Sequence, residues 1–200
     1  MPQFIIKPLT LQDADSSAKL HQEGMPKDFL PSFGFEFLKK LHQAIIINPE
    51  VISLGCFDKN QLIGILIGSR HTRNLFRQIF RHYKFKLLPH VLTQTFRHPL
   101  ILKKFLQTFI YGVATPRTIP AEIIILSISE NYRRRGIANK LFKSLIDKYK
   151  ELKVSVFIVG TTVENEPANN FYVKVGGQYI KKFDIYNRTW NIYVFNIKNL

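Results

Sequence analysis

The sequence predicts an α+β fold, in which helices pack on a mixed β-sheet. Three observations predict it. Short apolar runs alternate with amphipathic helical patterns, and the order of these elements is βααββ, a helical insertion, then βαβαββ. In addition, 46% of the 200 residues are hydrophobic, which is ample for one core. We therefore expect a single domain over residues 1–200, with the insertion at about residues 70–120.

The elements before the insertion are predicted from periodicity and from stop signals. They are a strand at Phe4–Lys7, a helix from Leu11 to about Glu23 that begins at a Thr10–Asp13 capping box, a loop at Met25–Phe33, and a second helix that ends at Asn48. Two apolar runs, Val51–Phe57 and Leu62–Ile67, are separated by Asp-Lys-Asn-Gln. That spacing predicts a hairpin.

The insertion, roughly Arg70 to Pro120, has the pattern of helices. One apolar stripe consists of Leu75, Phe76, Ile79, Phe80 and Tyr83, and the opposite face holds Arg73, Arg77, Arg81 and Lys84. A second stripe begins after Pro99 and runs from Leu100 to Ile110. A shorter helical piece around Val91 is expected between the two stripes.

Positive charge is concentrated in this insertion. The chain has a formal net charge of +15, and no acidic residue occurs between Asp58 and Glu122. Such a field attracts an anionic partner. Three interpretations stay open: a helical cap with a solvated basic face, a lid whose arginines bind a phosphorylated or nucleotide-linked substrate, and an amphipathic surface that contacts an anionic membrane.

Several classes of protein are disfavoured. The one cysteine, Cys56, lies in an apolar run and is expected to be a core residue in a reducing compartment. The start of the chain has no signal-peptide pattern and no apolar run is long enough to span a membrane, so a cytoplasmic protein is expected. No Cys-x-x-Cys or His-x-x-x-His pair suggests a metal site.

The segment Ala121–Lys150 is the most informative part of the chain. An isoleucine-rich run typical of a buried strand leads into Glu-Asn-Tyr-Arg-Arg-Arg-Gly-Ile-Ala and then into an amphipathic helix. Gly136 permits a tight turn, after which the first helical N–H groups have no partner in the helix. Those N–H groups and the helix dipole make an anion site, to which three arginines add charge. A solvated basic turn before an ordinary helix is the alternative.

This segment resembles the acetyl-CoA-binding signature of the GNAT superfamily of N-acetyltransferases, Gln/Arg-x-x-Gly-x-Gly/Ala, which here reads Arg133-x-x-Gly136-x-Ala138. A second signature of that family follows at the usual distance, as Asn165-x-x-Ala168-x-x-Phe171-Tyr172. Together they cover roughly the C-terminal two fifths of the chain. The resemblance implies a mostly antiparallel, seven-stranded sheet whose fourth and fifth strands splay apart to admit the cofactor. The long helical insertion departs from the usual family order.

The resemblance also implies acetyl-CoA as the co-substrate and assigns residues to it. The diphosphate would be held by Arg133, Arg134, Arg135, Gly136, Ile137 and Ala138. The pantetheine arm would follow the backbone of Leu126, Ser127 and Ile128. Asn165 would bond the arm, Phe171 would pack beneath it, and Ala168 belongs to the same site.

Two residues are candidates for proton transfer. An aliphatic ammonium, with a reference pKa of about 10, must lose a proton before it can attack a thioester. Glu122 matches the glutamate that is the general base in the histone acetyltransferase branch, and we expect it to share a strand face with Ile124, Leu126 and Ile128. A solvated glutamate, or one paired with Arg117, is the alternative, and a water chain could replace it. Tyr172 matches the family's proton donor to the departing thiolate; a core tyrosine is the alternative.

The resemblance implies direct transfer of acetyl to a primary amine. The long helical insertion and the Phe-Leu-Pro-Ser loop before the second helix resemble family members found with surface-glycan synthesis, which implies a small-molecule acceptor such as an amino sugar or a nucleotide-linked amino sugar. The basic insertion is compatible with this acceptor, because a nucleotide diphosphate is anionic. The alternatives are a protein lysine or N-terminus, and a nucleic-acid or ribosome-binding module on the same scaffold. Nucleic acid is the less favoured partner, and a homodimer stays open.

Overall fold

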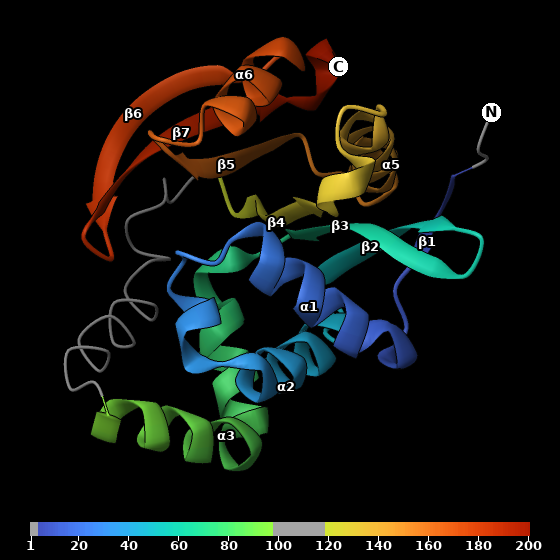
Figure 1. Ribbon diagram of the computed structural model, residues 1–200. Helices are drawn as coiled ribbons and strands as arrows, with labels where there is room; N and C mark the ends of the chain where they lie inside the picture. The colour runs from blue at the N-terminus through green and yellow to red at the C-terminus, as the bar shows by residue number, and fades with distance from the viewer. Residues whose placement is uncertain (1–3, 98–118) are drawn as a thin grey trace.

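The computed structural model describes residues 4–97 and 119–200. A seven-stranded sheet in the order β1-β2-β3-β4-β5-β7-β6 forms its middle layer (Figure 1). All neighbouring strands are antiparallel except β4 and β5, which are parallel. The strands are β1 Ile5–Pro8, β2 Val51–Asp58, β3 Gln61–Ser69, β4 Ala121–Ile128, β5 Val156–Thr162, β6 Gln178–Ile185 and β7 Arg188–Asn196. The prediction of an α+β fold with a mostly antiparallel sheet is confirmed.

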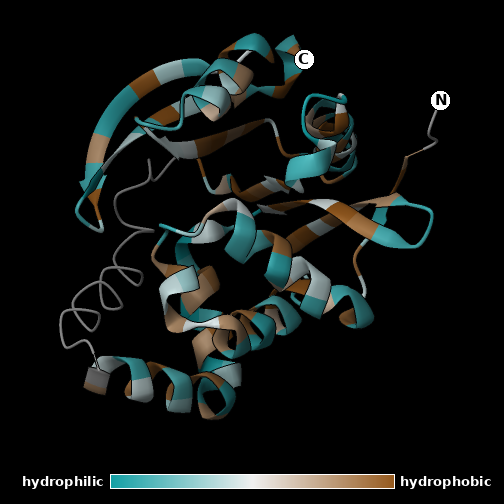
Figure 2. Cartoon of the chain, viewed as in Figure 1, coloured by the Kyte–Doolittle hydropathy of each residue, from teal (hydrophilic) through white to brown (hydrophobic). Residues whose placement is uncertain are grey.

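Helices cover both faces of the sheet (Figure 1). The α-helices are α1 Ala14–Gly24, α2 Phe35–Ile46, α3 Thr72–Arg97, α5 Ile137–Glu151 and α6 Glu166–Lys174. Short 3-10 helices are η1 Leu11–Asp13, η2 Leu30–Phe33, η3 Glu130–Tyr132 and η4 Ile197–Asn199. One core cluster joins α1, α2 and α3 to the sheet, and a second joins α5 and α6 to its opposite face. Figure 2 shows the central strands as the most hydrophobic part of the sheet.

Two glycines of β3 let α5 lie directly on the sheet. A Cβ on Gly64 would approach the Ile128 side chain to 2.7 Å, and a Cβ on Gly68 would come equally close to the Tyr149 hydroxyl. That hydroxyl donates to the carbonyl oxygens of Ser69 and Glu122, at 3.1 Å each. The close packing that these glycines predict is therefore present. Cys56 is buried in the same cluster, as expected, and burial raises the pKa of its thiol to about 11.

β4 and β5 pair over only three positions, from Ala121 opposite Phe157 to Ile123 opposite Val159. Beyond these pairs the two strands no longer bond to each other, although each keeps its other neighbour. The splayed fourth and fifth strands predicted from the family resemblance are therefore present. We call the resulting gap the β4–β5 opening, and the cavities described below lie along it.

A β-bulge in β4 overturns the predicted face pattern. Ile123 pairs with Gly68, and Ile125 pairs with Ile67, so Ile124 is an extra residue. Ile124 and Ile125 both pack with the α1–α2–α3 cluster, whereas Leu126 and Ile128 pack with α5. The expectation that Glu122, Ile124, Leu126 and Ile128 share one face is wrong, because the bulge breaks the two-residue alternation.

The insertion begins as the single long helix α3. Its predicted apolar stripe is largely buried, since Leu75, Phe76 and Ile79 belong to the core and α3 packs against α2 and η2. The helix continues through Pro89, so the separate piece expected around Val91 is wrong. Figure 1 shows that α3 changes direction along its length, as an internal proline favours. The second predicted stripe, Leu100 to Ile110, lies outside the described residues.

Two further expectations need correction. The loop expected at Met25–Phe33 contains η2, and Phe29 and Phe33 turn into the core, where their rings meet edge to face. The sequence predicts the last hairpin turn at Asn187-Arg188, but the β6–β7 turn lies one residue earlier, at Tyr186–Asn187. Both turn residues have positive φ (56° and 61°), which matches the twist of a two-residue hairpin. No helix within residues 4–97 and 119–200 is long and apolar enough to cross a membrane.

Candidate functional site

The turn between β4 and α5 has the geometry of an anion site. Gly136, the residue that precedes α5, is left-handed with a φ of 76°, and its missing side chain leaves the helix end uncapped. The backbone N–H of Lys140 donates to the Gly136 carbonyl at 3.1 Å, so the N–H groups before it have no acceptor within the helix. A Cβ on Gly136 would meet nothing within 4 Å. The space in front of these N–H groups is therefore open to a ligand.

The three arginines of the turn have different positions. Arg133 donates from Nε to the Ile128 carbonyl at 3.2 Å, which holds it beside the end of β4. Arg134 is itself left-handed, with a φ of 61°. Arg135 instead stacks over the Tyr132 ring, 5.1 Å from its centroid. Arg133 and Arg134 line the adjacent cavity and Arg135 does not.

A cavity of about 600 Å³ extends from this turn along the β4–β5 opening to α6. Every residue that the family resemblance assigned to the cofactor lines it, with the exception of Arg135. It is also lined by residues that were not assigned, namely Gly24, Tyr132, Asn139, Pro167 and Lys174. An anion site at one end and apolar walls from β4 and α6 suit a long ligand with a diphosphate and a thin arm. The residues therefore fit acetyl-CoA.

Ser127 and Gly24 join α1 to the strand that borders this cavity. The Ser127 hydroxyl donates to the Leu20 carbonyl at 2.7 Å. A side chain on Gly24 would collide with that hydroxyl. The end of α1 is therefore held against β4 at the point where the cavity begins.

α6 is fixed by two asparagines. The Asn165 side chain accepts from the backbone N–H of Ala168 at 3.3 Å and so caps the helix, which leaves its amide nitrogen for a ligand. Asn169 donates to the carbonyls of Thr162 and Asn165, at 2.9 and 2.8 Å. Its Oδ1 accepts from the Tyr193 hydroxyl and from the Asn191 amide, at 2.8 Å each. The sequence did not identify Asn169 as a residue of the site, because its partners Asn191 and Tyr193 come close to it only in the folded chain.

Tyr172 lies where two cavities meet. It lines the large cavity and also a second one of about 400 Å³, which lies between the α1–α2 loop, the β4–β5 opening and β7. Its ring packs among Phe171, Tyr193 and Phe195. Burial raises the pKa of its phenol, so the group keeps its proton and can act as a donor.

The second cavity is bordered by an ion pair between distant parts of the chain. Arg188, at the start of β7, donates to Asp28 of the α1–α2 loop at 2.6 Å and to the Thr162 hydroxyl at 3.0 Å. Tyr186 stacks on Phe29, with ring centroids 4.8 Å apart. Burial raises the pKa of Asp28, and Arg188 partly opposes that shift. We call this contact the Asp28–Arg188 bridge.

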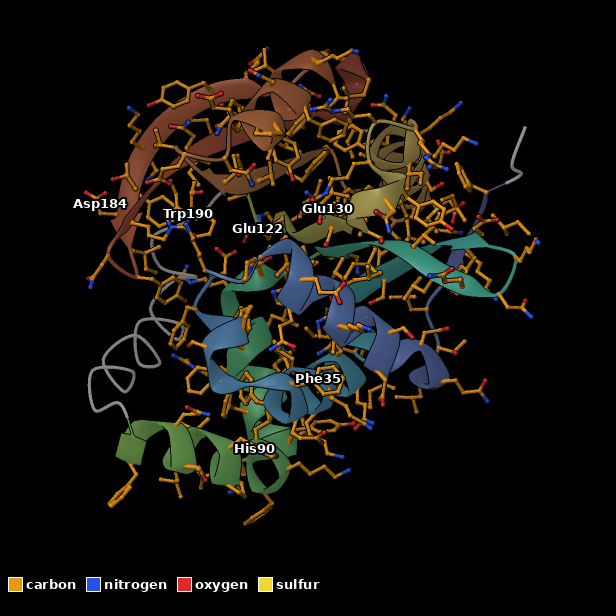
Figure 3. All side chains as sticks on the ribbon, in the orientation of Figure 1. Phe35, His90, Glu122, Glu130, Asp184 and Trp190 are labelled. Carbon is orange, nitrogen blue, oxygen red and sulfur yellow. The ribbon has the colours of Figure 1, made fainter. Side chains whose placement is uncertain are left out.

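Glu122 is buried in a smaller third cavity of about 100 Å³, which adjoins the second one. Trp190 of β7 lines both the second and the third cavity. Figure 3 labels the side chains of Trp190 and of Glu122 on β4. Glu122 is thus buried, and it lines neither of the two cavities that Tyr172 lines. Arg117, its alternative partner, is outside the described residues.

His21 also lines this third cavity and ends a buried polar chain. The Ser17 hydroxyl lies 2.8 Å from His42 Nδ1, and His42 Nε2 lies 3.0 Å from His21 Nδ1. Burial lowers the pKa of His21 to about 4 and, together with the neighbouring His21, lowers that of His42. Both imidazoles are therefore neutral near pH 7. Within residues 4–97 and 119–200, no cluster of three His, Cys, Asp or Glu side chains could hold a metal ion.

Comparison with known proteins gives one sequence relative of defined activity. The chain is 32% identical over 77 residues to N-alpha-acetyltransferase 30 of Schizosaccharomyces pombe. The match covers 38% of this chain and 47% of that protein, so it spans about half the length of the curated relative.

Solved structures share the fold over nearly the whole chain. The ribosomal-protein-S18-alanine N-acetyltransferase of Escherichia coli has a TM-score of 0.62 at 11% identity and covers 98% of this chain and 94% of its own. Arabidopsis thaliana NAA60, solved with acetyl-CoA, has a TM-score of 0.64 at 13% identity, and the match covers 98% of this chain and 99% of NAA60. The sequence matches the Acetyltransferase (GNAT) family over residues 18–177. The chain therefore belongs to the GNAT acetyltransferase family, whose enzymes use acetyl-CoA as co-substrate.

Proposed function

We propose that the protein transfers the acetyl group of acetyl-CoA to the free α-amine at the N-terminus of a peptide or protein. The observation that carries the proposal is the meeting of two cavities at Tyr172. The first ends at the cationic β4–α5 turn, and the second ends between the α1–α2 loop and the β6–β7 hairpin. A thioester at their junction would face an amine that enters from the second cavity.

The second cavity contains a carboxylate that an ammonium group can approach. Its lining includes the carboxylates of Asp28 and Glu164 and the cations of Lys27 and Arg188. Asp28 and Arg188 occupy each other at 2.6 Å, and Arg188 lies 3.7 Å from Glu164. Glu164, whose side chain is 66% exposed, is therefore the more accessible carboxylate for an ammonium group.

The comparisons support an N-terminal acceptor. The sequence relative is titled an N-alpha-acetyltransferase. A second structure of Arabidopsis thaliana NAA60, in complex with a bisubstrate analogue, shares the fold with a TM-score of 0.63 at 13% identity.

The reaction needs two proton movements. The ammonium loses a proton, its nitrogen attacks the thioester carbon, and the C–S bond breaks to leave a thiolate that takes up a proton. We assign the donor role to Tyr172, whose phenol stays protonated. We assign the acceptor role to Glu122 acting through water, because Glu122 lines the adjoining cavity rather than the junction.

A small-molecule amine is the second candidate. Two structural neighbours are titled agmatine N-acetyltransferase and polyamine N acetyltransferase, with TM-scores of 0.61 and 0.62. The third cavity, with its apolar walls and Trp190, would take the body of a small amine such as an amino sugar.

A panel assay with a free-thiol readout tests both candidates. The panel contains peptides with free and with blocked α-amines, each with and without an internal lysine, and also amino sugars, nucleotide-linked amino sugars and polyamines. We expect thiol release only with free α-amines, and an acetyl group on the first residue by mass spectrometry. Release with blocked, lysine-containing peptides or with amino sugars would overturn the N-terminal acceptor. Salt-sensitive RNA retention without any thiol release would favour a binding module.

A further inference from the structure

The second half of α3 exposes an apolar stripe. Four side chains spaced three, four and four residues apart lie on one side of the helix, and they are 82%, 43%, 59% and 92% exposed: Phe85, Leu88, Leu92 and Phe96. Phenylalanine and leucine are rarely left this exposed in a row on a monomeric protein. Within residues 4–97 and 119–200 the stripe is therefore left uncovered, which makes it a candidate contact surface.

The core does not need this stripe, because α3 packs inward through different residues. Leu87 and Val91 are buried and complete the contact with the helical layer. The start of the helix contributes Leu75 and Phe76 to the same cluster. Figure 2 shows hydrophobic and hydrophilic segments mixed along the part of α3 that lies farthest from the sheet.

Cations flank the stripe on both sides. By helical position, Lys84 lies along one edge and Lys86 along the other, while Arg81 lies one turn before Phe85 at the end of the stripe; all three side chains are exposed. Lys84 lies over the Phe85 ring, 5.1 Å from its centroid. No acidic residue occurs in the sequence between Asp58 and Glu122, so nothing on this helix neutralises them. An apolar centre with basic edges is the pattern of a helix that lies in a membrane interface.

We propose that this surface, which we call the α3 face (Phe85, Leu88, Leu92 and Phe96 with Arg81 and Lys84), docks the enzyme on an anionic lipid bilayer. The rings and leucines would enter the acyl boundary while the cations meet lipid phosphates. A second copy of the chain is a poorer partner, because two such basic edges would repel each other. A nucleic acid would leave the apolar centre uncovered.

This role is independent of the acceptor. Docking would, however, orient the enzyme relative to the bilayer, because the first turns of α3 carry Thr72 and Phe76, which line the cavity that contains Glu122. One continuous helix therefore connects the α3 face to the third cavity.

Vesicle flotation of the full chain tests the proposal. Vesicles of phosphatidylcholine alone are compared with vesicles that also contain phosphatidylglycerol. We expect partitioning to be about ten-fold stronger with the anionic lipid, and to fall sharply near 1 M salt, where the Debye length is about 3 Å. Equal partitioning into both kinds of vesicle would overturn the proposal.

Two variants locate the contact. Phe85→Ser with Phe96→Ser should abolish flotation, and Arg81→Gln with Lys84→Gln should weaken it and flatten its salt dependence. The matched controls are Leu152→Ser with Ile180→Ser, which are exposed apolar residues elsewhere, and Lys143→Gln with Lys150→Gln on α5. All four should keep the wild-type thermal shift with acetyl-CoA, which shows that they fold. Flotation of the phenylalanine variant at the wild-type level, or a change in its oligomeric size without vesicles, would contradict the membrane role.

Discussion

Arg188 and Asp28 are 160 positions apart in sequence, yet their side chains form a hydrogen-bonded ion pair of 2.6 Å. The pair joins the first residue of β7 to the loop that follows α1. Both groups are about three quarters buried, at 26% and 24% exposure, so they are poorly solvated. Removing one partner leaves the other charge in a partly desolvated place. The bridge therefore holds two sides of the proposed acceptor cavity at a set separation.

Replacing Arg188 should affect the acceptor more than the co-substrate. For Arg188→Gln we expect a KM for the amine that is raised about ten-fold, as loss of one charged hydrogen bond predicts, with an unchanged Kd for acetyl-CoA. Steady-state kinetics and calorimetry give the two quantities. Lys182→Gln, an exposed change on the same hairpin, is the control and should alter neither. A weakened Kd for acetyl-CoA with an unchanged KM would refute this assignment.

Gly136 should be required for acetyl-CoA binding beyond its effect on folding. Gly136→Ala places a Cβ on a left-handed residue, which costs about 1 kcal/mol of stability, and it crowds the open space before α5. Gly34→Ala strains the backbone more, because φ 88° and ψ 170° lie in a region that glycine alone adopts readily, but Gly34 lies at the start of α2. Both variants should lose melting temperature, Gly34→Ala more, and only Gly136→Ala should lose affinity in a titration with acetyl-CoA. Equal affinities would show that the turn does not contact the ligand.

Tyr172→Phe should lower kcat by about 100-fold, the lower range for loss of a general acid. Acetyl-CoA affinity should survive, because the ring and its packing are kept. Tyr179→Phe, on an exposed ring of β6, is the control. A Tyr172→Phe enzyme with wild-type kcat would remove this residue from the mechanism.

Glu122→Gln should change the dependence of rate on pH. If Glu122 accepts the proton, the acidic limb of the kcat/KM profile should disappear or move, while the melting temperature changes little because the substitution is nearly isosteric. Profiles of kcat/KM for both enzymes provide the measurement. Superimposable profiles would show that a group other than Glu122 accepts the proton of the amine.

The buried histidines should make stability depend on pH. Their pKa values are lowered in the folded protein, so the unfolded chain binds more protons below about pH 6.5. Stability should then fall as the pH drops from about 6.5 towards 4, by up to about 1.4 kcal/mol per pH unit for each histidine. Urea unfolding near pH 7 and near pH 5 measures the loss. His42→Gln should reduce it, whereas His82→Gln on the exposed side of α3 should not.

Local sequence patterns predicted the strands, most of the helices and the tight β4–α5 turn. Gly136, the arginines before it and Tyr172 are close in sequence to the strand and helices that position them. The bulge at Ile124 could not be predicted, because an unbroken isoleucine run has no signal for an extra residue. Because of this bulge, Leu126 and Ile128 lie on the face of the sheet opposite to Ile124, whereas the sequence predicted all three on one face.

The acceptor side could not be predicted because its contacts are tertiary. Asp28 and Arg188, or Asn169 and Tyr193, meet only after the sheet has formed. One signal was available for the histidines. His21 and His42 occupy positions on the apolar faces of their helices, where a polar side chain requires a buried partner.

The construction of the two cavities from different connections has an evolutionary consequence. The proposed diphosphate end depends on the β4–α5 turn, whereas the outer wall of the proposed amine end is made by the α1–α2 loop and the start of β7. Mutations in those two short segments can therefore retarget the enzyme towards new amines while its use of a common acetyl donor is inherited unchanged.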